Sequence, residues 1–304
     1  MSRHAFQAAL APFLLVLHSA CLAAPDCRHA APAPSAARLE VPAGTRIGIA
    51  LGSGSMHGYA HIGVLQEIEA RGLPVQVVTG TSVGALMGAL WASGMDARGI
   101  EALARETSIE DLSRPSGSWQ GLFSSDPLRG PLQAAFGGRP IESWPRSFGA
   151  VATHVEDGQR RLIVRGDAVD AIRASSAVPV LFMPVMRDRE RLVDGALVEP
   201  VPVAAARDLG ANFVIAIDVA YRPHEEAASG LAGYAFQAVH ILVNSLAAEQ
   251  LRTADVAIRP NLHQRWMECG REGLVAAGRE AVARSWPEIT RALLARTPGS
   301  VARR

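Results

Sequence analysis

Two neighbouring segments of the chain follow the same order of strand, glycine turn and helix. The first, RIGIALGSGSMHGYAHIGVLQEIEARG, has β-branched residues before a glycine cluster, then Ile62, Leu65 and Ile68 at helical spacing, with Gly72 as a stop. The second, PVQVVTGTSVGALMGALWASG, repeats this order and ends near Gly94. Two consecutive units of this kind predict a mainly parallel central sheet that is covered by helices.

Shorter strands and helices are predicted along the rest of the chain. Asp96 can cap a third helix, and Asp167 can cap a short helix that ends before Pro179. Residues 111–145 are rich in Ser, Pro, Gly and Trp without a clear period, so we expect a long irregular insertion there. FGAVATHV and RRLIVRG, joined by EDGQ, predict a hairpin. Later segments predict a strand end with a turn (LVDGALV), a buried strand (NFVIAIDV), a long helix (AFQAVHILVNSLAAEQ) and a last strand (ADVAIRP).

The N-terminal stretch has the pattern of an export signal. Arg3 and His4 precede an apolar run, and small residues follow it, as in secretory signal peptides. We therefore expect a protein exported across the inner membrane to the periplasm or cell envelope; a lipoprotein anchored through Cys21 stays open as the alternative. The four predicted parts are a signal peptide (1–24), an Ala/Pro-rich linker (25–44), an α/β domain (45–222) and a helical C-terminal extension packed on the same domain (223–304).

Composition removes several classes of function. The formal net charge is +1 and like charges do not cluster, so no nucleic-acid partner is expected. The 30 basic residues other than histidine are all Arg, which excludes a Schiff-base lysine and a P-loop lysine. If the signal is removed after Ala24, Cys27 and Cys269 remain and could pair in an oxidising compartment.

The second glycine turn carries the pattern G-x-S-x-G. Gly80, Ser82 and Gly84 stand between a predicted strand and a predicted helix, which is the setting that a nucleophile elbow requires. Glycines allow the sharp turn, and the helix that follows directs its positive end at a developing oxyanion. A chance match in a glycine-rich chain is the alternative. The strand and helix around the pattern favour Ser82 as a nucleophile.

The first glycine turn, GSGSMHG, predicts an anion-binding loop. Backbone N–H groups at Gly52, Gly54 and Ser55 would stand at the start of a helix, where they can stabilise negative charge. A phosphate cradle of the dinucleotide type is the other possibility, but neither reading frame gives G-x-G-x-x-G. An oxyanion hole fits the spacing better.

Asp194 is the candidate base. It precedes Gly195 at a predicted strand end, and a plain Asp-Gly turn is the alternative. The histidines that follow Asp194 are His224, His240 and His263, and none stands in a glycine-turned loop of the kind that holds a triad histidine. A carboxylate acting alone is the simpler hypothesis, and it needs close contact with the serine in a partly dry site.

Three stretches together resemble the patatin-like phospholipase family, in the bacterial branch related to neuropathy target esterase. They are IALGSGSMHGYAHIGVLQEIEARGLPVQVVTGTSVGAL, AIRASSAVPVLFMPV and LVDGALVEPVPVAAARDLGANFVIAIDV. The resemblance implies a three-layer α/β fold for residues 45–222, a Ser-Asp dyad, no metal or other cofactor, and hydrolysis of acyl esters of lipids. By position, Ser82 matches the nucleophile, Asp194 the dyad aspartate, and Gly52, Gly54 and Ser55 the oxyanion loop.

The chain departs from the family pattern at position 57. The family commonly has Arg there, whereas His57 is charged only in acid if its pKa is ordinary. We expect hydrolysis of anionic phospholipids to depend on His57 ionisation if that charge is used. Glu199, in VEPVP, is a second and minor difference.

Two further features have a structural alternative. His57 and His61 have a spacing that can bind metal on a helix, but no third ligand is evident, so we expect His61 to pack on its helix. Trp119, Leu122 and Phe123 either form an apolar lip that contacts a membrane peripherally or anchor an ordinary loop.

The sequence therefore predicts a serine lipid acyl hydrolase, of the phospholipase A, lysophospholipase or carboxylesterase kind, acting on a lipid or other ester. An acyltransferase and a lipid-binding or regulatory protein without activity are the rivals.

Overall fold

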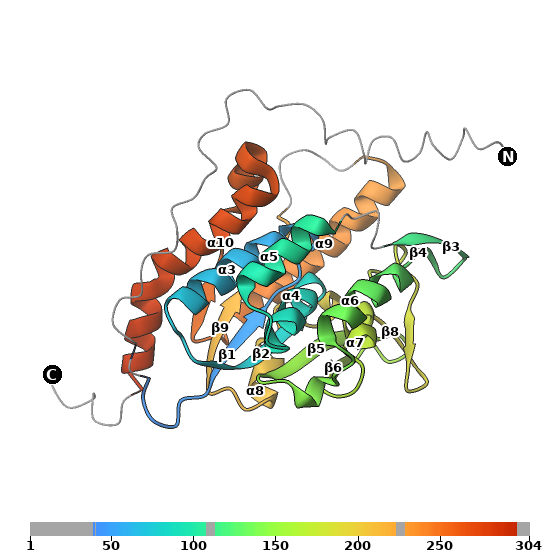
Figure 1. Ribbon diagram of the computed structural model, residues 1–304. Helices are drawn as coiled ribbons and strands as arrows, with labels where there is room; N and C mark the ends of the chain where they lie inside the picture. The colour runs from blue at the N-terminus through green and yellow to red at the C-terminus, as the bar shows by residue number, and fades with distance from the viewer. Residues whose placement is uncertain (1–38, 40, 108–112, 223–228, 297–304) are drawn as a thin grey trace.

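The computed structural model describes residues 39, 41–107, 113–222 and 229–296 (Figure 1). The expected signal peptide, nearly all of the expected linker, and His224, Cys21 and Cys27 lie outside the described residues. Cys269 lies within them and is disulfide-bonded. Among the described helices, none is long and apolar enough to cross a membrane.

A mixed sheet with a parallel centre forms the middle of the molecule. Strands β10, β9, β1, β2 and β5 are parallel neighbours in that order, and β8, β7 and β6 add to the β5 side as antiparallel strands. The strand bounds are β1 Ile47–Leu51, β2 Val75–Thr81, β5 Ser147–His154, β6 Arg160–Ile163, β7 Val185–Arg187, β8 Glu190–Asp194, β9 Phe213–Ile217 and β10 Val256–Ile258. The central strands are buried along almost their whole length, as expected of parallel strands covered on both faces.

Helices cover the sheet and confirm the predicted α/β class (Figure 1). Their bounds are α3 Tyr59–Ala70, α4 Val83–Ala92, α5 Ala97–Glu106, α6 Arg129–Phe136, α7 Ala168–Ser175, α8 Val203–Asp208, α9 Gly230–Leu251 and α10 Leu262–Leu294. The long helix α10 lies along α3, where Arg279 donates to Gln66 at 2.6 Å and the Arg71 guanidinium lies over the Trp286 ring. The C-terminal part of the chain thus packs on the core.

Local signals in the sequence explain several element ends. The Asp96 carboxylate accepts the Gly99 N–H at 2.7 Å and begins α5, and Asp167 accepts the Val169 N–H at 2.7 Å and begins α7. The predicted hairpin is confirmed as the antiparallel pair β5–β6, and ADVAIRP contains β10.

The prediction of an irregular insertion over residues 111–145 is wrong. The segment contains a hairpin, a helix and two single helical turns: β3 Arg114–Ser118, β4 Gly121–Ser124, η4 Asp126–Leu128, α6 and η5 Ile141–Ser143. These elements are short, and their apolar positions are few; α6 buries only Leu132 and Phe136, and Phe136 packs against Trp144. Such short elements leave no period to detect.

Candidate active site

The strand register brings the predicted catalytic residues to one edge of the sheet. Ser82 follows β2, and the last residue of β2, Thr81, lies opposite Val151 of β5. The next residue of β5, Ala152, lies opposite Asp194, the last residue of β8. Because neighbouring strands are about 4.8 Å apart, this register places Asp194 two strands from the turn that holds Ser82.

Ser82 stands in a strained turn between β2 and α4. Its φ of 56° and ψ of −125° are values that a non-glycine residue rarely adopts. The turn requires Gly84, because a Cβ there would lie 2.1 Å from the carbonyl oxygen of Leu51. The sequence G-x-S-x-G therefore folds as an elbow, with Ser82 at the N-cap of α4 and 9% exposed.

Ser175, to which the sequence analysis gave no role, supports the turn that contains Ser82 through a hydrogen bond. The Ser82 N–H donates to the Ser175 hydroxyl at 2.9 Å, and that hydroxyl donates to the Val151 carbonyl at 2.6 Å. Ser175 is fully buried at the last position of α7. It lies within AIRASSAVPV, so the stretch that carries the resemblance was the available signal.

Asp194 is held at the end of β8 and hydrogen-bonded to Ser82. Its carboxylate accepts the Ala196 N–H at 2.8 Å and the Ser82 hydroxyl. The side chain is buried, and desolvation raises its pKa to about 6, while the two hydrogen bonds lower it in part. A carboxylate of this kind is a better base toward a serine hydroxyl than an ordinary Asp, and it is still ionised at pH 7.

The glycine loop lies beside the elbow, but its N–H groups are not equivalent. Gly52 and Ser53 donate their N–H groups to Ile217 and Pro200 at 2.9 Å each, so neither can point at a substrate. Gly54 must be glycine because a Cβ would lie 2.3 Å from the Val219 carbonyl oxygen. The oxyanion role therefore narrows to the N–H groups of Gly54 and Ser55, for which it stays a prediction, and Gly52 serves to anchor the loop.

His61 anchors this loop from inside α3. Its Nε2 lies 2.8 Å from the Gly52 carbonyl oxygen, to which it donates, and its Nδ1 is buried without a hydrogen-bond partner among the described residues. Burial lowers the pKa of His61 to about 4, so the ring is neutral at pH 7. His61, which was expected to pack on its helix, is fully buried, and its hydrogen bond positions Gly52.

His57 takes part in a small aromatic cluster on the outer side of the loop. Its Nδ1 lies 3.2 Å from the Val219 carbonyl oxygen, and its ring stacks on Tyr221 with centroids 6.0 Å apart. Among the described residues, no group of three metal-ligating side chains is found. Whether the charge of His57 serves catalysis stays a prediction.

Glu199, treated above as a minor difference, is a structural residue. Its buried carboxylate accepts the Ala205 N–H at 3.0 Å near the start of α8 and pairs with Arg160 at 2.9 Å. Its carbonyl oxygen accepts the Thr81 hydroxyl at 2.7 Å, next to the nucleophile. Glu199 thus stabilises the floor of the elbow.

The β3–β4 hairpin forms a lip near Asp194. Leu122 and Phe123 donate their N–H groups to the carbonyl oxygens of residues 180 and 181, which follow α7 closely. The Asp194 N–H donates to the carbonyl oxygen of Ala177, which lies between α7 and these two residues. Phe123 packs on Phe182 and anchors the lip, whereas the Trp119 and Leu122 side chains are exposed. Phe123 therefore anchors the loop, and contact of Trp119 and Leu122 with a membrane stays a prediction.

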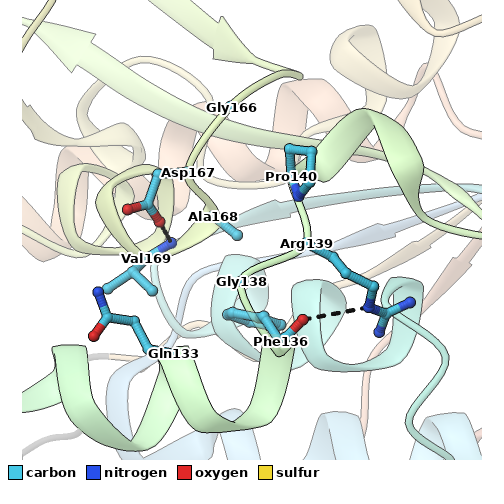
Figure 2. A pocket seen from close by; sticks show the side chains of 9 residues that line it. All are labelled: Gln133, Phe136, Gly138, Arg139, Pro140, Gly166, Asp167, Ala168 and Val169. Carbon is cyan, nitrogen blue, oxygen red and sulfur yellow. Dashed lines mark hydrogen bonds between the residues drawn. The ribbon is translucent and has the colours of Figure 1, made fainter.

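Neither of two cavities formed by the described residues is lined by Ser82 or Asp194. One, of about 510 Å³, is lined by residues next to Asp194, among them Thr153, Val193 and Leu197. The other, of about 260 Å³, lies between the C-terminal end of α6 and the start of α7 (Figure 2). Asp167 and Arg139 in its wall use polar atoms to bond Val169 and Phe136 (Figure 2), and Ser175 lies at the other end of α7.

A serine on a strand–turn–helix elbow, a buried acid hydrogen-bonded to it and a glycine loop beside both are the arrangement typical of α/β serine hydrolases. The chain belongs to the patatin-like phospholipase family, whose profile, described as Patatin-like phospholipase, matches residues 49–207. The family places the chain among lipid hydrolases in general.

Similar proteins support this assignment to different degrees. An uncharacterised NTE family protein of Mycobacterium tuberculosis is 35% identical over 191 residues, covering 62% of this chain and 53% of that protein. Neuropathy target esterase sws of Drosophila melanogaster is 33% identical over 187 residues, covering 58% of this chain and 13% of that protein. The chain thus spans about half the length of the mycobacterial relative.

The fold is also found in a solved structure. VipD from Legionella pneumophila superposes with a TM-score of 0.52 at 14% identity, covering 79% of this chain and 66% of that chain. At this identity the likeness concerns the fold alone, and it agrees with the patatin-like architecture expected from the sequence.

Proposed function

We propose that this protein is a serine acyl hydrolase of lipids that uses a Ser82–Asp194 dyad and an acyl-enzyme. The observation that carries the proposal is the buried Asp194 carboxylate, hydrogen-bonded to Ser82 and with its pKa raised to about 6. Phospholipase A, lysophospholipase and carboxylesterase activities all fall within this proposal.

In the proposed first step, the Ser82 oxygen attacks the ester carbonyl and Asp194 accepts the hydroxyl proton. The N–H groups of Gly54 and Ser55, together with that of Val83 at the start of α4, face the oxygen that becomes negative. The ester C–O bond then breaks, Asp194 returns the proton to the leaving alcohol, and an acyl-Ser82 ester remains.

In the second step, water attacks the acyl-Ser82 ester. Asp194 accepts a proton from the water and returns it to the Ser82 oxygen as the fatty acid leaves. The same carboxylate is thus base and acid in turn, which a pKa near the working pH favours. The loop does not move between the steps in this scheme.

The test is turnover of a panel of phospholipids, lysophospholipids and short p-nitrophenyl esters, with products identified in the presence and absence of an added alcohol. We expect free fatty acid as the main product. Ester formation with the alcohol at the expense of free acid would favour the acyltransferase rival, and no turnover of any ester would favour the non-catalytic rival.

We also propose that the chain is exported, on the basis of residues 1–24. The mature protein should begin near Pro25 and be recovered from the periplasm or envelope. N-terminal sequencing decides this: a chain that begins at Met1 or Ser2 contradicts export, and a diacylglyceryl group on Cys21 would establish the lipoprotein.

A further inference from the structure

Helix α9 is much longer than the strands that it connects. It joins the parallel neighbours β9 and β10, so its N-terminal end lies at the carboxyl edge of the sheet. With 22 residues it is about 33 Å long, whereas the five residues of β9 span about 17 Å. Its C-terminal half buries Val243, Ala247 and Leu251. The N-terminal half therefore projects beyond the edge that holds Ser82 and Asp194 (Figure 1).

The projecting half is apolar and exposed. Between the start of α9 and Val243, the first residue of the helix that is buried among those described, the large exposed side chains have exposed fractions from 36% to 90%; they are Leu231, Tyr234, Phe236, Val239, Ile241 and Leu242. From Ser229 to Ala248 the sequence contains no Arg, Lys, Asp or Glu, and burial lowers the pKa of His240, so this half is uncharged at pH 7. Soluble monomers rarely expose an apolar surface of this extent without an interaction to explain it.

Aromatic contacts join this helix to the oxyanion loop. The Tyr221 ring lies 5.2 Å from the His240 ring of α9 and 6.0 Å from the His57 ring of the loop. Asn244 of α9 also donates its side-chain N–H to the Tyr221 carbonyl at 2.8 Å. The exposed helix is thus continuous with the candidate active site.

A second apolar projection stands on the Asp194 side of the site. Trp119 at the turn of the β3–β4 hairpin and Leu122 on β4 are exposed, as is Val180, to which Leu122 is hydrogen-bonded. The first projection lies in the segment after β9, and the second is hydrogen-bonded to residues 180 and 181, which follow α7.

We propose that the projecting half of α9, with the tip of the β3–β4 hairpin, is the surface by which the enzyme docks on a lipid layer. The inference rests on the proposed function, because it identifies the substrate as an ester held in a membrane or micelle. In this orientation, the edge of the sheet that contains Ser82 faces the lipid layer.

The chemistry of the surface favours lipid over a protein partner. A projecting rod with apolar side chains over a broad arc needs no complementary shape in a fluid layer, whereas a protein interface needs a fitted surface with a polar, hydrogen-bonding rim. Charged residues of α9 begin only at Glu249, which pairs with Arg252 at the end that packs against the sheet. The exposed apolar part of the helix therefore carries no charged side chain.

Binding to vesicles tests the proposal without requiring turnover. Sedimentation of the full chain is measured with vesicles of phosphatidylcholine alone and with added phosphatidylglycerol. Leu231→Glu and Leu242→Glu replace side chains that are 90% and 65% exposed, so the fold does not depend on them. Each should weaken vesicle binding by about tenfold or more, because a charge must leave water with the helix.

Leu294→Glu, at the far end of α10 and 53% exposed, is the matched control and should bind vesicles as the wild type does. The proposal would be overturned if Leu231→Glu and Leu242→Glu bound both vesicle types as tightly as the wild type does. It would also be overturned if the wild type bound neither vesicle type. A stable dimer that Leu242→Glu dissociates would assign the surface to a second copy instead. Hydrolysis of a short soluble ester is measured in parallel; its absence would count against the proposed function, while sedimentation still decides the docking.

Discussion

The two residues of the proposed dyad lie in parts of the sheet that are built in different ways. Ser82 follows a parallel strand, and its geometry is set mainly by the turn itself, with its strained φ of 56°, while Gly84 of the same turn packs closely on Leu51 of the neighbouring strand β1. Asp194 ends an antiparallel strand, and its geometry is set by segments distant in sequence, through burial and the register with β5. The position of the nucleophile is thus determined mainly by its own turn, whereas the basicity of Asp194 is determined by the fold around it.

The difference has an energetic side. The strain at Ser82 and the burial of an ionisable Asp194 both disfavour the folded state, by about 1–3 kcal/mol each. They are tolerated because the surrounding strands and helices are densely packed and almost fully buried. The site therefore lowers the stability of an otherwise stable core, and its function accounts for this cost.

Among the substitutions that test the two halves of the dyad, Ser82→Ala should have the largest effect on activity. It removes the nucleophile and little packing, so hydrolysis should fall by about 10⁴-fold or more while the thermal midpoint changes little. Ester turnover and circular dichroism measure the two effects. Ser93→Ala, a buried serine at the end of α4 whose hydroxyl bonds Leu90, is the control and should keep its activity.

Asp194→Asn tests the other half of the dyad. The amide keeps the shape and can still accept the Ala196 N–H, but it cannot take a proton, so kcat should fall by about 10³-fold or more. Asp218→Asn is the matched control, since Asp218 is also a buried aspartate following a strand and pairs with Arg222. If both variants lost activity equally, buried charge in general and not the dyad would be responsible.

The pH profile sharpens the comparison, because only the Asp194 half titrates. Asp194 must be ionised to act as a base, and its pKa is raised to about 6, so kcat/KM for a neutral ester should rise about tenfold per pH unit below 6 and level off above it. A profile that is flat down to pH 4.5 would mean that the base has an ordinary carboxylate pKa and would refute the role given to burial.

His61→Asn probes the support of the oxyanion loop with a smaller expected effect. Loss of the hydrogen bond to Gly52 should lower kcat by about tenfold and leave KM nearly unchanged, because the loop acts on the transition state. The pH profile above 5 should keep its shape, since burial lowers the pKa of His61 to about 4 and the wild-type ring is already neutral there. A profile shifted by the substitution would instead show that His61 takes part in proton transfer.

The effect of Asp194 on stability depends on pH and has a defined sign. The pKa of Asp194 is about 6 when folded against 3.8 ordinarily, so the stability that its protonated form contributes is present below pH 3.8 and is lost as pH rises through 6. Asp194→Asn should therefore be more stable than the wild type by up to about 3 kcal/mol at pH 8, and the difference should vanish near pH 4. Urea titrations at the two pH values measure it; a gain that is equal at both would place its cause in packing.

Much of the fold and part of the site follow from local sequence. The two strand–glycine–helix units, the Asp96 and Asp167 caps and the elbow at Ser82 are each specified within one continuous stretch of sequence, and the structure has them where the patterns place them. Asp194 could be named as a candidate base from its place at a strand end, but an Asp-Gly pair by itself is an ordinary turn, and the resemblance was needed to favour the catalytic role.

The remaining features depend on contacts between distant segments. The support of Ser82 by Ser175, and the anchoring of Gly52 by His61, join residues on different elements. The Gly52 N–H likewise donates to Ile217 on β9, and this hydrogen bond removes it as an oxyanion donor. No periodicity along the chain reports such pairings.

The measurement that tests the dyad most directly is covalent labelling with a fluorophosphonate, followed by mass mapping of the labelled peptide. The account predicts a single label on Ser82, formed at a rate that rises with pH through about 6 in the wild type and falls by orders of magnitude in Asp194→Asn. A label on another residue, or labelling of Ser82 at the same rate with and without the Asp194 carboxylate, would contradict it.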